Sequence, residues 1–165
     1  MITIQRNTDE NFTAIRAVAA EVWPIAYGLI LSQAQLDYMM EMMYSVSSLQ
    51  HQVNEKGHRF ILAIEDDTVL GFASFEFNYN KKPKTKIHKI YVLPNQQGKG
   101  IGKALVDFIN NEAKSKHQKA LILNVNKKNI AIRFYEAIGF DISYEEVLDI
   151  GNGYVMDDYV MEKPI

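Results

Sequence analysis

The chain has no cysteine, few prolines, no long apolar run and almost no net charge. The lack of cysteine excludes disulfides, thiolate metal sites and cysteine nucleophiles. The apolar runs fall well short of the ~20 residues that cross a bilayer, and Met1 to Arg6 lack the basic and apolar regions of a signal peptide. A formal net charge of −2 gives no field that would draw the chain to nucleic acid or an anionic membrane. We expect a cytoplasmic protein with neither partner and no metal.

What is present is the composition of a soluble globular protein. Apolar residues make up 47% of the 165 positions and charged residues 23%. No internal repeat, linker or low-complexity segment divides the chain, and its length suffices for a sizeable core. We therefore expect a single domain over residues 1–165.

Apolar periodicity predicts alternating strands and helices. Thr8 or Asp9 is expected to cap the first helix, Pro24 to end or kink it, and Ser32 with Gln35 to form a capping box on the second. The segment from 86 to 125 forms a β-α-β unit, which should be parallel and right-handed, whereas hairpins make the remaining sheet antiparallel. The fold class is therefore α/β with a mixed sheet. Strands are expected at 2–6, 59–65, 69–77, 86–93, 120–125, 140–150 and 154–163, and helices at 12–22, 32–43, 101–117 and 131–138.

Glycine is scarce, yet Gly98, Gly100 and Gly102 stand at alternate positions directly before the helix at 101–117. Glycines there let backbone N–H groups approach a ligand, and a helix N-terminus favours negative charge. Lys99 and Lys103 would add positive charge. The segment therefore predicts an anion site, most naturally for phosphate; the alternative is a flexible connection without a ligand.

Two common phosphate-binding motifs do not fit this segment. A Walker A loop needs Ser or Thr after Gly-Lys, where Ala104 stands, and an earlier glycine where Gln97 stands. A dinucleotide fingerprint counted from Gly98 needs a third glycine where Lys103 stands. Neither nucleotide-binding motif is therefore present.

A third pattern does fit, because Gln97 to Gly102 matches the Arg/Gln-x-x-Gly-x-Gly/Ala element of the GNAT acetyltransferases. The segment from Asn129 to Phe140 resembles the family signature Asn-x-x-Ala-x-x-Phe-Tyr-Glu-x-x-Gly-Phe, with Ala131 one place early. The expected element order also resembles the family over essentially the whole chain. The resemblance implies a GNAT acyl-CoA N-acyltransferase fold, in which helices flank a mixed central sheet with a splayed parallel strand pair.

The resemblance implies acetyl-CoA as the cofactor, with its pyrophosphate on the glycine segment. The pantetheine arm would pair with the strand before that segment, where Ile90 to Leu93 also break the expected alternation. Asn129 would cap its helix and contact the cofactor, and Asn124 would bridge the splayed strands through water. The implied cofactor-binding residues are Ile90, Tyr91, Val92, Gln97, Gly98, Lys99, Gly100, Ile101, Gly102, Lys103, Asn124, Asn129 and Tyr135.

The implied reaction is direct attack of a neutral amine on the thioester. An N–H near Val92 would stabilise the oxyanion, and Tyr135 would protonate the leaving sulfur, although by position alone Tyr135 is a core residue. Many relatives carry a glutamate base on the strand before the loop, where this chain has Lys86, His88 and Lys89. His88, with an ordinary pKa of ~6.5, is the candidate base. The alternatives are Glu76, a chain of water molecules, or a surface His88 without a role.

Aromatic residues flank the break between the first two helices, where the family encloses its acceptors. Trp23 and Tyr27, with Glu76, are the candidate substrate-binding residues, although core packing explains the two aromatics equally well. The last hairpin carries acidic residues that would attract a cationic amine, or simply form a solvated face. These are Glu145, Glu146, Asp149, Asp157 and Asp158.

The preferred function is transfer of an acetyl group from acetyl-CoA to a small-molecule primary amine or polyamine. The segment from His88 to Leu105 resembles the bacterial spermidine/spermine acetyltransferase-like branch of the family, which favours a polyamine. The alternatives are a protein or peptide N-acetyltransferase and a non-catalytic regulatory module that binds acyl-CoA. The edges of the last hairpin allow a homodimer.

Overall fold

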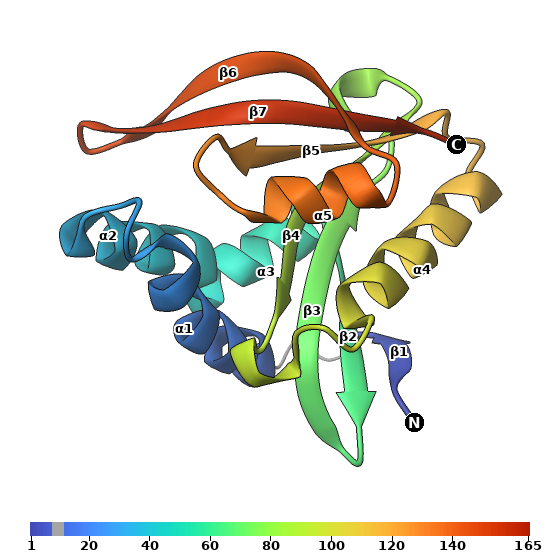
Figure 1. Cartoon of the computed structure of the whole chain (residues 1–165), viewed down its shortest axis with the longest axis horizontal. Helices are drawn as coiled ribbons and strands as arrows, with labels where there is room; N and C mark the ends of the chain where they lie inside the picture. Colours follow the sequence, from blue (N-terminus) through green and yellow to red (C-terminus); the bar gives the residue numbers. More distant parts are fainter. Residues whose placement is uncertain (8–11) are drawn as a thin grey trace.

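The computed structural model describes residues 1–7 and 12–165 and shows helices on both faces of one mixed sheet (Figure 1). Its elements are β1 (Thr3–Arg6), α1 (Thr13–Tyr27), α2 (Gln33–Tyr44), α3 (Val46–Asn54), β2 (Arg59–Glu65), β3 (Thr68–Glu76), η1 (Tyr79–Lys81), β4 (Lys84–Val92), η2 (Pro94–Gln96), α4 (Ile101–Ser115), β5 (Ala120–Asn126), α5 (Ala131–Ala137), β6 (Asp141–Gly151) and β7 (Tyr154–Pro164). Within the described ranges, no helix is long and apolar enough to cross a membrane.

The sheet has the strand order β1-β2-β3-β4-β5-β7-β6, and β4 and β5 are its parallel pair. One apolar cluster packs α4 and α5 against the sheet around Leu105 and Phe140. A second packs α1, α2 and α3 against the sheet around Trp23 and Phe72. The predicted α/β class, the mixed sheet and its parallel pair are confirmed.

Local sequence signals explain several boundaries. Asp66 and Asp67 have φ of 49° and 62°, as a two-residue hairpin turn between β2 and β3 requires. The Ser32 side chain caps α2 by accepting a hydrogen bond from the Gln35 N–H. Pro24 lies inside α1, which continues to Tyr27, so the possibility that Pro24 ends the helix was wrong. The expected cap at Thr8 or Asp9 lies outside the described residues.

Helix α3 was missing from the predicted order, which had two helices before the second strand. Ser45 separates α3 from α2 and caps it by accepting a hydrogen bond from the Ser48 N–H. The helix has nine residues and buries only Leu49 and Gln52. Such a short and mostly polar segment has too little apolar periodicity to predict a helix.

The parallel pair opens partway along its length. Lys84 to Ile87 pair with Ala120 to Leu123, after which β4 and β5 diverge and β5 continues beside β7 (Figure 1). In the β3–β4 ladder, Lys89 faces Ser74 and Ile87 faces Phe75, so His88 is the extra residue of a bulge. The irregularity in the ladder therefore lies at His88, and the expectation of one at Ile90 to Leu93 was wrong, because Ile90 to Val92 pair with β3 in regular register. The edge of β4 that faces β5 is left unpaired beyond this point.

Candidate active site

The glycine segment forms the turn into α4. Gly98 and Gly100 have φ of 82° and 79°, in the region that side chains disfavour, and Gly100 is the N-cap of α4. A Cβ atom at either position would point into open space, so the backbone there is accessible to a ligand. Gly102 has a different role, since its Cβ would lie 3.2 Å from the Phe134 ring. That glycine allows α4 to pack closely on α5.

The N-terminus of α4 has the electrostatics of an anion site. No side chain caps it and its first turn carries no acidic residue, so its first N–H groups remain available. Lys99 and Lys103 stand nearby, hydrogen-bonded only to Gln96 and Asp107 on the same surface. The Gln97 side chain donates to the Val92 carbonyl at 3.4 Å and so joins the turn to the end of β4. This turn therefore remains open to an anionic group.

Tyr135 of α5 lies in the core between two aromatic rings. Its ring centroid is 5.3 Å from that of Phe134 and 5.8 Å from that of Phe140. Burial, with a smaller effect from Tyr27, raises the pKa of the Tyr135 phenol above its ordinary value. The phenol therefore stays protonated at neutral pH and can donate. Asn129 stands before α5 and accepts a hydrogen bond from the Ala131 N–H at 2.9 Å.

The unpaired part of β4 brings a second phenol to the opening. The hydroxyl of Tyr91 lies 3.2 Å from that of Tyr27 on α1. Trp23, one helical turn before Tyr27, is 2% exposed and its ring centroid is 5.8 Å from that of Tyr91. Trp23 therefore packs in the core and does not line an open surface, which favours the packing interpretation of its sequence position. Tyr27 is itself buried and contacts Tyr91 through its hydroxyl.

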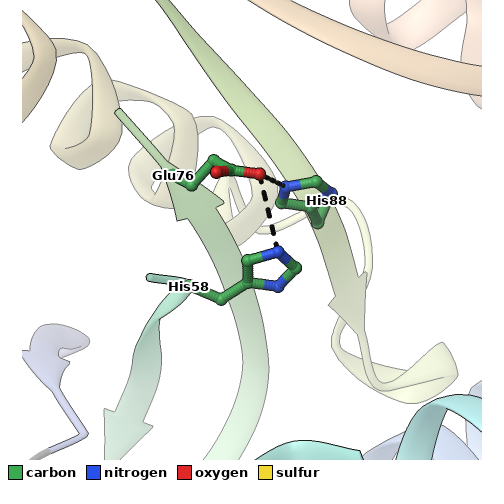
Figure 2. Close-up of side chains that lie close together, drawn as sticks. All are labelled: His58, Glu76 and His88. Carbon is green, nitrogen blue, oxygen red and sulfur yellow. Dashed lines mark hydrogen bonds and ion pairs between the residues drawn. The ribbon is translucent and has the colours of Figure 1, made fainter. Parts of the chain in front are cut away.

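His88 belongs to a cluster that the sequence did not predict in full. Figure 2 shows His58 and His88 turned toward the carboxylate of Glu76. The Nε2 atom of His88 lies 2.7 Å from Glu76 Oε1, and the Nε2 atom of His58 lies 3.6 Å from the same oxygen. The bulge places His88 here, and His58 comes from the turn before β2. Sequence reasoning missed His58 because no motif surrounds it.

Both imidazoles of this cluster are neutral at physiological pH. Burial lowers the pKa of His88 to about 2, helped by the neighbouring His58, Lys89 and Lys86. Burial also lowers the pKa of His58 to about 4 and raises that of Glu76 above its ordinary value. The His88 Nε2–H therefore donates to the Glu76 carboxylate. This bond leaves the other ring nitrogen of His88 as a proton acceptor.

The three side chains bring one ligand atom each within 4.8 Å of one another, which raises the question of a metal ion. The two imidazole planes, however, lie nearly parallel, at 14°, with centroids 3.9 Å apart. Nitrogen lone pairs lie in the ring planes, so they cannot converge on one ion at the ~2.0–2.1 Å that zinc requires. Lys86 and Lys89 also place positive charge beside the cluster. The arrangement fits a hydrogen-bonded cluster and not a metal centre.

A second polar group lies where the strands separate. Asn124 is the first β5 residue past the last β4–β5 pair, and its Oδ1 accepts a hydrogen bond from Lys86 of β4. Its Nδ2 donates to Glu146 Oε2 at 2.9 Å and to Asp158 Oδ2 at 3.4 Å. Asn124 thus links the splayed strands by a direct side-chain bond, where the sequence predicted a water bridge. The Lys86 ammonium also lies 4.9 Å from the centroid of the Tyr79 ring.

Comparisons with known proteins agree with this architecture. Residues 23–140 match the family model described as the acetyltransferase (GNAT) family. The PaiA N-acetyltransferase of Thermoplasma acidophilum, solved in complex with coenzyme A, superposes with a TM-score of 0.83 and 25% identity over 100% of this chain and 99% of that one. The sequence relatives match only part of the chain.

One such relative is the L-methionine sulfoximine/L-methionine sulfone acetyltransferase of Salmonella typhimurium, 29% identical over 53% of this chain and 53% of that protein. The chain therefore spans about half the length of that curated relative. Another is the ribosomal protein bS18-alanine N-acetyltransferase of Haemophilus influenzae, 30% identical over 61% of this chain and 74% of that protein.

Proposed function

The chain belongs to the GNAT acetyltransferase family, and on that premise we propose that it transfers an acetyl group from acetyl-CoA to a small cationic amine. One structural observation supports this proposal most strongly. The unpaired edge of β4 lies between an open helix N-terminus and a group of proton-transfer and acidic side chains. An anionic carrier and a cationic acceptor could therefore meet at one opening.

The turn from Gln97 to Lys103 would hold the pyrophosphate of acetyl-CoA. Its glycines expose backbone amides, and the dipole of α4 favours the negative charge. The free edge from Ile90 to Val92 would pair with the amide groups of the pantetheine arm as a neighbouring strand does. The coenzyme A that accompanies the PaiA structure supports this assignment, because that chain is similar over its whole length. The bound cofactor would supply an activated thioester carbonyl.

Two groups of the chain would move protons in the reaction. The amine nitrogen forms a bond to the thioester carbon, the carbon–sulfur bond breaks, and the sulfur leaves as a thiolate. His88, in its neutral form, accepts the proton of the amine on its free ring nitrogen and passes its Nε2 proton to Glu76, the carboxylate whose pKa burial raises. Tyr135 donates its phenolic proton to the sulfur, because burial keeps that phenol protonated. A backbone N–H of the free β4 edge stabilises the oxyanion.

The preferred acceptor is a di- or polyamine such as spermidine. Glu76, Glu146 and Asp158 all act electrostatically on Lys86, and Lys56 also acts on Glu76. Three carboxylates beside two lysines leave an excess of negative charge, which favours a cationic ligand over a neutral or anionic one. A small-molecule acceptor is therefore the first choice, with no nucleic acid involved.

The test is a panel of amines assayed with acetyl-CoA for release of free CoA thiol and for the acetylated product by mass spectrometry. The panel should hold spermidine, 1,4-diaminobutane, an aminoglycoside, L-methionine sulfone and a peptide that begins with alanine. We expect the di- and polyamines to give the highest kcat/KM. Binding of acetyl-CoA without acetylation of any amine would contradict the proposal and favour a regulatory binding module.

A protein N-terminus is the second candidate acceptor. The relative from Haemophilus influenzae is named for acetylation of an alanine of ribosomal protein bS18, and it matches this chain over 111 residues. Preference for the alanine peptide over every small amine in the same panel would favour this second function.

A further inference from the structure

We propose that Asp158, with Glu146 and Asn124, forms a site for a second ammonium group of the acceptor, distinct from the nitrogen that is acetylated. This inference rests on the proposed acetyl transfer to amines and names the residues that select a diamine. The strongest sign of the site is Asp158 itself, which is only 4% exposed. Its Oδ1 atom is buried without a hydrogen-bond partner among the residues that the structure describes.

A buried carboxylate oxygen without a partner is unfavourable, because it has lost water and gained no donor. The other oxygen of Asp158 accepts only a long hydrogen bond, 3.4 Å, from Asn124. A carboxylate that is held on one side and free on the other is arranged to receive a donor. An ammonium group supplies both the donors and the opposite charge.

The strand register gives a second reason to expect a cation beside Asp158. Glu146 and Asp158 are directly opposite partners in the β6–β7 ladder, and both accept from the same Asn124 amide. Like charges directly opposite each other on one face of a sheet destabilise it. A cation between these two carboxylates would remove that repulsion.

The neighbouring acidic residues of the hairpin are already paired. Lys127 lies 2.9 Å from Asp157 and 3.5 Å from Glu145, so those carboxylates have a cation of their own. Glu146 and Asp158 interact electrostatically with Lys86, which also acts on Glu76. The unbalanced negative charge of the hairpin is therefore at the pair beside the splayed strands.

Lys86 shows how the residues beside Asp158 contact an ammonium group. Its Nζ donates to Asn124 Oδ1 and lies 4.9 Å from the Tyr79 ring centroid, the combination of amide oxygen, aromatic face and nearby carboxylates that a cation prefers. Because Asp158 Oδ1 is covered, an incoming ammonium must displace a neighbour to reach it. The neighbour that it would displace is Lys86, whose long side chain can move aside.

The site also lies within reach of the reaction. Tyr27, whose hydroxyl contacts Tyr91 on the free β4 edge, has its pKa raised mainly by burial and additionally by the charge of Asp158. Asp158 is also hydrogen-bonded to Asn124, which lies where β4 and β5 separate. An acceptor with two nitrogens a few bonds apart can place one at Asp158 and the other at the thioester.

The test compares 1,4-diaminobutane with butylamine, which has the same chain and lacks the second ammonium. In the wild type we expect a KM for the diamine at least tenfold lower than for the monoamine. Asp158→Asn should remove most of that difference by raising the KM of the diamine at least tenfold relative to the KM of butylamine. Lys86→Met should act in the opposite direction and lower the KM of the diamine.

Asp157→Asn is the matched control, because it removes the same charge from the same hairpin at a carboxylate that Lys127 already pairs. Glu146→Gln, at a half-buried position, gives a second test if Asp158→Asn does not fold, and it should also weaken the diamine preference. If the wild type acetylates both amines equally, or if Asp158→Asn and Glu146→Gln keep the diamine preference, the ammonium site is wrong although acetyl transfer stands. If no amine is acetylated, the proposed function itself fails.

Discussion

His58 and His88 stack with their ring centroids 3.9 Å apart, and both point a ring nitrogen at the same oxygen of Glu76 (Figure 2). His88 lies on β4 and His58 directly precedes β2, and β3 lies between these two strands. Their contact depends on the bulge that places His88 out of the regular ladder. Two neutral imidazoles beside one carboxylate have consequences for stability and for activity.

The first consequence is loss of stability in acid. The folded pKa values of His58 and His88 lie below the ~6.5 of an unfolded histidine, so below that pH the unfolded chain binds protons that the folded chain does not. The free energy of unfolding should therefore fall as pH decreases from about 6.5 toward 4, by up to about 1.4 kcal/mol per pH unit for each histidine. The raised pKa of Glu76 offsets part of this fall, because the folded chain keeps a proton on this carboxyl that the unfolded chain has lost.

Urea denaturation at several pH values measures this dependence. The double variant His58→Gln/His88→Gln should have a flatter profile than the wild type. His117→Asn, at an exposed position with φ of 56°, is the control and should keep the full dependence. Identical slopes for the wild type and the double variant would show that the two histidines titrate normally.

The second consequence concerns the proposed base. His88→Gln should lower kcat by roughly 10²-fold or more, because it removes the acceptor of the amine proton, while the affinity for acetyl-CoA stays the same. Glu76→Gln should lower kcat as well, since it removes the carboxylate that receives the proton from His88. His51→Gln, on exposed α3, is the control. A kcat in His88→Gln equal to that of the wild type would exclude His88 as the base.

Removing the phenol oxygen of Tyr135 tests its proposed role as the general acid. Tyr135→Phe should lower turnover by about 10²-fold, within the range of general acid catalysis, and leave acetyl-CoA affinity unchanged. Tyr144→Phe is the matched control, because that phenol is 51% exposed on β6. Calorimetry and steady-state kinetics separate the two effects. Equal turnover in Tyr135→Phe and the wild type would leave Tyr135 with a packing role only.

Gly100→Val tests the anion site. The new side chain would project into the open space beside the turn, so CoA binding should weaken at least tenfold. Gly153→Val is a close control, since its φ of 78° and open surroundings match the 79° of Gly100 at a distant hairpin turn. Both variants carry the same backbone strain, on the order of 1–2 kcal/mol. Calorimetric titration with CoA should therefore distinguish them, and equal loss of affinity would contradict the site.

A buried lysine gives the last prediction. Lys89 is 4% exposed, donates to Gln52 at 2.5 Å, and has a pKa lowered to about 7, first by burial and then by Lys56. Between pH 7 and about 10 the unfolded chain holds a proton on this lysine that the folded chain does not. The stability of the wild type relative to Lys89→Met should therefore rise by about 1.4 kcal/mol per pH unit over that range.

Chemical denaturation of both proteins at pH 7, 8, 9 and 10 measures that difference. Replacement of exposed Lys128 by methionine controls for the loss of a surface lysine. A constant difference between the wild type and Lys89→Met across this range would mean that Lys89 keeps its proton in the folded state.

The sequence by itself determined the features that depend on neighbouring residues. The glycines of the 98–102 segment, the following amphipathic helix and the strand before it predicted both the parallel β-α-β unit and an anion site at its turn. The Asp66–Asp67 turn and the Ser32 cap were predictable for the same reason, because each is set by backbone preferences within a few residues. The mixed sheet then followed from the rules of strand connection.

Tertiary structure alone decided which polar residues meet. A one-residue bulge brings His88 to Glu76 and His58, and the register of β6 with β7 places Glu146 opposite Asp158. It also decided that Trp23 is buried and that α3 forms between α2 and β2. Register and burial depend on contacts between residues far apart in the chain, and a shift of one residue turns every side chain to the other face. Local periodicity contains no information on that choice.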